Sequence, residues 1–283
     1  MKKRWILLIA LFLMLAITPA NASASIDINF DTPITLTVNN TLIKTDTDPF
    51  LYQGSTFVPI RFISEALGAD SVEWNGAKNE AVIVYGEKII RLPKGKKGGY
   101  INDRYVTIPS GVQLVNNRIY VPVRFVSEEL DCQVNWIYET YTVDIRKKGV
   151  VVPHELVGKR SYTDDEIYWL SKIIHAESQG EPMTGKIAVG NVVLNRVESR
   201  DYPNTIYGVI FDKNHGVQFS PVLNGTIYHT PYGDSIIAAK RALEGESHAG
   251  ESLFFLNPRI SENFWIPKNR IYFTTIANHD FYL

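Results

Sequence analysis

The sequence predicts two domains: an amino-terminal α+β repeat module and a mainly α-helical carboxy-terminal domain. Two observations predict this: an internal repeat with an offset of about 63 residues in the first half, and helix-type apolar spacing after residue 163. With 283 residues, 45% hydrophobic and 21% charged, the chain is long and apolar enough for globular domains. A formal net charge of -1 argues against a general attraction to nucleic acid, and a single cysteine excludes an internal disulfide framework.

Residues 1–24 have the pattern of a secretory signal peptide. Basic residues at positions 2–4 precede an apolar run from Trp5 to Ile17, and small residues follow at Ala20-Asn21-Ala22. An uncleaved membrane anchor is the alternative, but the run is short for a bilayer span. No later stretch approaches the length of a transmembrane helix, so we expect a secreted protein with no membrane span after signal cleavage.

Residues 25–147 contain the internal repeat. Phe57–Leu67 matches Tyr120–Leu130 almost residue by residue, and Trp74 corresponds to Trp136 after a one-residue deletion. Each copy predicts a strand, a short helix that begins after a proline, a strand with the tryptophan, and a further alternating strand. The first domain is therefore expected to be built from two similar units.

This pattern resembles the copper amine oxidase N-terminal-like domain, a two-copy module common on secreted bacterial proteins, over about residues 27–147. The family name does not imply copper here. This half lacks the imidazole and thioether ligands that copper prefers, because all six histidines follow residue 150 and Met183 is the one methionine beyond the signal peptide. We expect a non-catalytic module that positions the protein or contacts wall polymers, with a simple spacer as the alternative. Arg61 and Arg124 recur inside the repeated motif and are expected to support the fold. Residues 148–161 are the predicted linker.

The second domain, residues 162–283, begins with a strong helix signal. Thr163 and Glu166 form a capping box, and apolar residues follow at helical spacing. Glu177 continues this apolar stripe just before the break at Gly180. The apolar members of the stripe are Ile167, Leu170 and Ile174.

The position of Glu177 has a chemical consequence. Partial burial and the negative end of the helix dipole both disfavour its carboxylate, so the pKa of Glu177 is expected to rise. A carboxylic acid that stays protonated near neutral pH suits the general acid of a glycosidase. A structural glutamate that accepts hydrogen bonds from loop N–H groups is the alternative interpretation.

Several ordered motifs of this half resemble the SleB-type, spore cortex-lytic cell wall hydrolase family over about residues 163–283. The motifs are His175–Pro182, Ala188–Val197, Gln218–Val222, Phe254–Pro258 and His279–Tyr282. The resemblance implies a lysozyme-like, mainly helical fold and a lytic transglycosylase that acts on peptidoglycan glycan strands. It implies Glu177 as the catalytic acid and base, no cofactor, and a location in the cell wall or the spore cortex.

Other residues of this half are candidates for substrate contacts around Glu177. Trp265 is a candidate for sugar stacking, Phe219 is a candidate platform with a core position as its alternative, and His279 is a cleft residue or a structural one. Glu181 contacts the substrate or bonds the loop, and it would be the second carboxylate of a water-using enzyme. The full set of expected substrate-binding residues is Glu181, Gln218, Phe219, Ser220, Asn257, Trp265 and His279.

Three other functions are alternatives to this interpretation. A muramidase would transfer the cleaved sugar to water instead of closing an anhydro ring. A non-catalytic wall-binding protein would retain the fold without the reaction. A zinc amidase is disfavoured, because no two histidines have the spacing of helical metal ligands.

Overall fold

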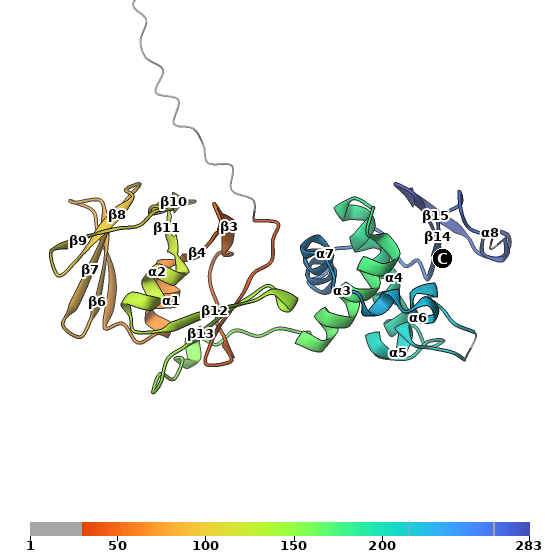
Figure 1. Cartoon of the computed structure of the whole chain (residues 1–283), viewed down its shortest axis with the longest axis horizontal. Coiled ribbons are helices and arrows are strands. Elements are labelled where there is room, and N and C mark those ends of the chain that lie inside the picture. The colour runs from red at the N-terminus through yellow and green to blue at the C-terminus, as the bar shows by residue number, and fades with distance from the viewer. Residues whose placement is uncertain (1–29, 215, 263) are drawn as a thin grey trace, which may run out of the picture.

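The structure is a computed structural model that describes residues 30–214, 216–262 and 264–283, and the predicted signal peptide lies outside these residues. The strands of the first half gather in one lobe, and the long helices gather in another (Figure 1). Among the described residues, no helix combines the length and the apolar character needed to cross a membrane.

The amino-terminal lobe is mostly sheet, which corrects the α+β prediction. Its two α-helices, counted over the described residues, are seven residues each: α1 (Ile60–Ala66) and α2 (Val123–Glu129). The chain between the repeat copies folds into hairpins, and at one of them Asn102 and Asp103 both have positive φ, as a type I′ turn requires. The strands are β1 (Thr35–Val38), β2 (Thr41–Leu42), β3 (Phe50–Tyr52), β4 (Ser55–Pro59), β5 (Ser71–Asn75), β6 (Glu80–Tyr85), β7 (Lys88–Pro93), β8 (Gly98–Ile101), β9 (Arg104–Thr107), β10 (Gln113–Val115), β11 (Arg118–Pro122), β12 (Gln133–Ile137) and β13 (Thr142–Arg146).

The internal repeat is confirmed in space. The units β4-α1-β5-β6 and β11-α2-β12-β13 have the same element order, and Pro59 and Pro122 each form the N-cap of the following helix. The two copies meet where β4 and β11 pair antiparallel, with Val58 opposite Val121. These two valines occupy equivalent positions, so the pairing relates the copies by a pseudo-twofold axis. The sheet orders are β12-β13-β1-β2, β10-β11-β4-β3 and β5-β6-β7-β8-β9.

The carboxy-terminal lobe is built around α3 (Asp164–Ser178), α4 (Met183–Glu198) and α7 (Gly233–Leu243). Gly190 lies where the three meet, since a Cβ there would stand 2.9 Å from Ile174 Cδ1 and 3.4 Å from Ala242 Cβ. The remaining elements are α5 (Ile206–Ile210), α6 (Ser220–Asn224), the 3-10 helix η3 (Thr226–Tyr228), β14 (Phe254–Leu256), α8 (Trp265–Asn269), β15 (Tyr272–Ile276) and β16 (His279–Tyr282). The last strands form a sheet of order β14-β16-β15, which the sequence prediction of a mainly helical domain did not include.

The predicted linker packs on the first lobe. Val152 and Leu156 are buried in the core of that lobe, and Leu156 belongs to the 3-10 helix η2 (His154–Leu156). The backbone N–H of Lys44 donates to the carbonyl of Leu156, and the N–H of Gly158 donates to the carbonyl of Leu42. The chain thus reaches α3 from a docked segment.

A buried lysine joins the two lobes. Lys240 of α7 is 1% exposed, and its Nζ donates to Thr35 Oγ1 at 2.8 Å and to the carbonyl of Thr140 at 3.0 Å. Thr35 begins β1, and Thr140 ends the 3-10 helix η1 (Tyr138–Thr140). Burial lowers the pKa of Lys240 to about 8. The contact therefore ties the helical lobe to both ends of the repeat module.

Candidate functional site

Glu177 is placed by the capping box at the other end of α3. Thr163 Oγ1 accepts from the N–H of Glu166 at 3.2 Å, and the Glu166 carboxylate accepts from the N–H of Thr163 at 2.7 Å. This fixes the start of the helix and therefore the direction of each later side chain. The predicted stripe of Ile167, Leu170 and Ile174 is fully buried, and Glu177 lies one residue before the helix ends.

The Glu177 carboxyl is a partly buried acid without a hydrogen-bonding partner in the described part of the chain. Burial raises its pKa to about 7, and the positive charge of Arg196 acts against this rise. Near neutral pH the group is therefore divided between its acid and base forms. It can donate a proton and later accept one, which is the property expected from its sequence position.

Arg196 of α4 is held in an aromatic cage. Its guanidinium carbon lies 5.0 Å from the ring centre of Tyr202, 5.1 Å from Phe219 and 5.6 Å from Phe254. Its Nε donates to the carbonyl of Leu253 at 2.8 Å, while Nη1 is buried with no partner among the described residues. Burial lowers the pKa of Arg196, and the electrostatic influence of Tyr202, Asp212 and Glu177 acts against this fall. The surrounding ring faces add cation–π contacts to the guanidinium.

Sequence reasoning missed this arginine as a site residue. Arg196 lies in the quoted motif Ala188–Val197, but nothing there marked its side chain as functional. The available signal was a charged residue that follows a long apolar run on one helix. No acidic residue lies three or four positions away to pair with it.

A second arginine extends the cage to the surface. The Arg270 guanidinium carbon lies 4.5 Å from the Phe254 ring and 5.1 Å from the Trp265 ring. Trp265 is 52% exposed at the start of α8. Phe254 thus has one arginine buried near Glu177 and another at the solvent, and Trp265 is the exposed end of this stack.

Glu181 lies in a different setting from Glu177. It is buried, and Asn278 donates to its carboxylate from the side-chain amide at 2.9 Å and from the backbone N–H at 3.2 Å. Burial alone would raise the pKa of Glu181, but the Asn278 bonds and the nearby His279 and Lys186 hold it below its ordinary value. Glu181 therefore fastens the α3–α4 loop to the β15–β16 turn as a carboxylate.

His279 lies with Glu181 in this second cluster. It is 7% exposed, its Nδ1 stands 3.8 Å from Glu181 Oε1, and its ring packs edge-on against Phe255 at 5.5 Å. Burial lowers the pKa of His279. A buried imidazole in this position supports the sheet. Phe255 links this cluster to the Arg196 cage, because its ring lies 5.5 Å from His279 and 6.5 Å from Phe219.

The remaining predicted contacts are distributed around the cage. Phe219 is 2% exposed, so it holds Arg196 and offers no free face for sugar stacking. Gln218 is partly buried and donates to the carbonyl of Gly216, and Ser220 is exposed at the start of α6. Asn257 follows β14 and caps a turn by accepting from the N–H of Arg259.

The described residues were compared with the side-chain groupings that bind metal ions. No group of three or more His, Cys, Asp or Glu side chains there has a ligand arrangement, and His215 lies outside the described residues. The chemistry available at Glu177 is proton transfer by one carboxyl beside a buried cation.

Each lobe matches a known protein family. Residues 37–145 match the family model of the copper amine oxidase N-terminal domain, and residues 180–282 match the cell wall hydrolase model. The second match begins three residues after Glu177, so the geometry of α3 is the basis for considering that residue.

The carboxy-terminal domain is of the wall-hydrolase class, and the chain belongs to the cell wall hydrolase family. It is 36% identical over 121 residues to a spore cortex-lytic enzyme of Bacillus cereus, with 43% of each chain covered. It is 30% identical over 103 residues to the cell wall hydrolase CwlJ of Oceanobacillus iheyensis, covering 34% of this chain and 72% of that one. The chain spans less than half the length of the spore cortex-lytic enzyme it matches.

A solved structure also matches. The catalytic domain of the germination-specific lytic transglycosylase SleB from Bacillus anthracis is 34% identical, with 44% of this chain and 100% of that chain covered and a TM-score of 0.41.

Proposed function

We propose that the protein is a secreted lytic transglycosylase that cleaves the glycosidic bond between N-acetylmuramic acid and N-acetylglucosamine in peptidoglycan. The supporting observation is Glu177, a partly buried carboxyl with a pKa of about 7 beside the charge of Arg196. The names of the relatives, spore cortex-lytic enzymes and a cell wall hydrolase, agree with this substrate. The domains of the proposal are a signal peptide at 1–24, the repeat module at 25–147 and the catalytic domain at 162–283.

In the first step, Glu177 acts as a general acid. Its proton passes to the glycosidic oxygen, the bond between that oxygen and C1 of the muramic acid breaks, and the N-acetylglucosamine leaves with a free hydroxyl. Positive charge develops at C1, and the acetamido group of the same sugar assists in place of an enzyme nucleophile. Arg196 stabilises the Glu177 carboxylate that remains after the proton is given.

In the second step, the same carboxylate acts as a general base. It takes the proton from the C6 hydroxyl of the muramic acid, and the C6 oxygen bonds to C1 to close a 1,6-anhydro ring. Glu177 ends the cycle protonated, so one carboxyl with a pKa near neutrality serves both steps. No cofactor takes part in this route.

The state of Glu181 favours this route over transfer to water. A water-using enzyme needs a second carboxylate that is free to hold and deprotonate a water molecule. The Glu181 carboxylate already accepts two hydrogen bonds from Asn278 and is buried. We therefore propose a positioning role for Glu181 and His279.

The residues proposed to contact the substrate around Glu177 are those that are exposed or partly exposed. Trp265 is 52% exposed and is the proposed contact for a sugar ring, and Gln218, Ser220 and Asn257 offer amide and hydroxyl groups. Phe219 contributes indirectly by holding Arg196. The repeat module is proposed as a non-catalytic contact to wall polymers.

The experiment that tests the proposal is digestion of purified peptidoglycan by residues 25–283, with the released muropeptides analysed by mass spectrometry. Vegetative and cortex peptidoglycan are digested in parallel. Fragments that end in 1,6-anhydromuramic acid, absent with Glu177→Gln, are the expected result. Reducing sugar ends would show that water is the acceptor. No fragments from either substrate would favour a wall-binding protein without this activity.

A further inference from the structure

Two grooves of the repeat module are formed by equivalent residues. Groove 1, of about 780 Å³, lies between the start of α2 and the β3–β4 hairpin, and its lining includes Arg124 and Trp136. Groove 2, of about 560 Å³, lies between the start of α1 and the β10–β11 hairpin, and its lining includes Arg61 and Trp74. Each groove takes its helix from one repeat copy and its hairpin from the other.

The pseudo-twofold axis explains this exchange. The pairing of Val58 with Val121 puts the hairpin of each copy beside the helix of the other, so one arrangement occurs twice. Leu51 and Leu114 are equivalent hairpin residues, one in each groove, and they are 39% and 38% exposed. The grooves are therefore two versions of one surface feature.

The tryptophan and the arginine that recur in the two grooves are exposed, so packing in the core does not account for them. Trp74 and Trp136 are 45% and 39% exposed, and Arg61 and Arg124 are exposed as well. This corrects the expectation that the two arginines support the fold. The ion pair of Arg124 with Glu128 is 3.8 Å long and lies at the surface, and such pairs contribute little stability. Both copies thus present an indole ring and a cation to solvent.

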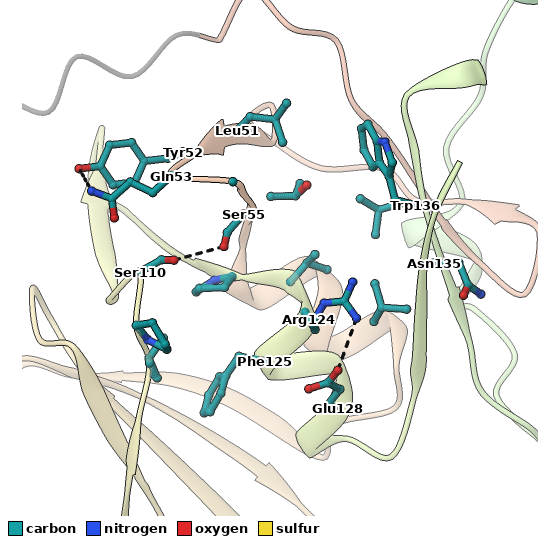
Figure 2. Close-up of a pocket in the computed structure, with 18 of the residues that line it drawn as sticks. Leu51, Tyr52, Gln53, Ser55, Ser110, Arg124, Phe125, Glu128, Asn135 and Trp136 are labelled. Atoms are coloured by element: carbon teal, nitrogen blue, oxygen red, sulfur yellow. Dashed lines mark hydrogen bonds and ion pairs between the residues drawn. The ribbon is translucent and has the colours of Figure 1, made fainter. Parts of the chain in front are cut away.

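Groove 1 combines apolar and polar faces in a way that suits a sugar. Figure 2 shows Arg124 inside the groove, with Leu51 above it and Trp136 to one side. On the opposite wall Ser55 and Ser110 are joined by a hydrogen bond of 3.2 Å. Rings that stack on apolar sugar faces and fixed polar groups that select hydroxyls are what a saccharide site requires.

We propose that grooves 1 and 2 are saccharide-binding sites that hold the glycan strand of peptidoglycan at two places. The choice of this saccharide rests on the proposed function. Muramic acid and its stem peptides carry carboxylates that Arg61 in groove 2 can attract, and Arg124 in groove 1 is free to do so if its weak surface pair with Glu128 opens. Both volumes fall in the range of ligand sites, and two weak sites on one strand gain affinity from each other.

Groove 1 also borders the catalytic lobe. Tyr138 and Tyr141 line it, and Tyr141 packs so closely on Gly233 of α7 that no Cβ fits there. Tyr141 also lies in a small core with Ile167 of α3. Ten residues separate Ile167 from Glu177, which is about 15 Å along the helix. A strand held in groove 1 therefore lies next to the lobe that contains the proposed acid.

The test is sedimentation binding to insoluble sacculi with the full mature chain carrying Glu177→Gln, so that the substrate stays intact. Trp74→Ala and Trp136→Ala are each expected to weaken binding by about tenfold, and together by more. The matched control is Tyr105→Ala, an exposed aromatic of the same module outside both grooves, expected to bind within about twofold of the parent. Arg61→Ala with Arg124→Ala is a second pair, and thermal unfolding checks the fold of each.

Four results would overturn the proposal. Binding of all tryptophan variants equal to the parent would remove the grooves from the interaction. Absence of any binding to sacculi would show that the glycan strand is not the ligand of the grooves. Loss of binding on sacculi stripped of anionic wall polymers would assign the grooves to those polymers. A change confined to the association state in ultracentrifugation would make the grooves a self-interface. The muropeptide assay of the active chain reports on Glu177 separately, so failure of either proposal is distinguishable.

Discussion

Glu177→Gln is expected to make the protein more stable at alkaline pH while it abolishes the reaction. Burial raises the pKa of Glu177 from 4.5 to about 7. A carboxyl whose folded pKa is raised adds stability that is complete below pH 4.5 and is lost as pH rises through 7. Above pH 8 the folded protein therefore holds a carboxylate at a free-energy cost, and neutral glutamine avoids that cost.

The size of the effect follows from the shift. A rise in pKa from 4.5 to about 7, at about 1.4 kcal/mol for each pH unit, gives an upper value of about 3.5 kcal/mol. Glu177 is only partly buried, so water reduces the cost, and we expect a gain of about 2 kcal/mol in the free energy of unfolding at pH 8.5. Near pH 4 the variant and the parent should be equal within about 0.5 kcal/mol.

Urea unfolding followed by tryptophan fluorescence at both pH values measures the difference. Glu181→Gln is the matched control with the opposite sign, because the pKa of Glu181 is lowered and its charged form is bonded by Asn278. That variant should lose stability at pH 8.5, with a smaller loss in acid. Equal stability of Glu177→Gln and the parent at pH 8.5 would refute the reasoning.

Three further outcomes are expected. The turnover rate should fall about tenfold per unit above pH 7, since Glu177 must be protonated to donate, and a flat profile from pH 6 to 9 would contradict this. Arg196→Met should shift that decline to higher pH, because its charge lowers the pKa of Glu177; an unchanged midpoint would speak against the coupling. Lys240 should contribute up to about 3 kcal/mol more stability at pH 10.5 than at pH 8, because its folded pKa is about 8 and the unfolded chain binds the extra proton; the stability difference between the parent and Lys240→Met in parallel denaturation curves should change by this amount.

The parts that the sequence predicted best are those fixed by local spacing. The capping box at Thr163, the buried face of α3 and the repeat units all depend on neighbours within one element or on a visible duplication. The pKa of Glu177 was predicted in direction, because burial follows from the stripe and the helix end follows from Gly180.

The parts that could not be predicted depend on contacts between distant segments. Phe219 holds Arg196 across a loop, and Asn278 reaches Glu181 from 97 residues away along the chain. The sheet-rich character of the first lobe depends on the hairpins of β7, β8 and β9 between the repeat copies, and the repeated motif does not contain these strands. Arg61 and Arg124 lie within a core motif, and only the three-dimensional pairing of the copies shows that they face solvent.

The Lys240 contact helps to fix the distance between groove 1 and Glu177. It bonds to Thr35, and β1 pairs in parallel with β13, so one side chain clamps the seam at which the repeat module closes. With the connecting segment docked as well, the spacing from groove 1 to Glu177 is set by packed structure. If groove 1 holds the glycan strand, this fixed distance sets where the strand is cleaved, and the early products should have a preferred chain length. Loosening the clamp should broaden that length distribution without changing the chemical ends of the fragments.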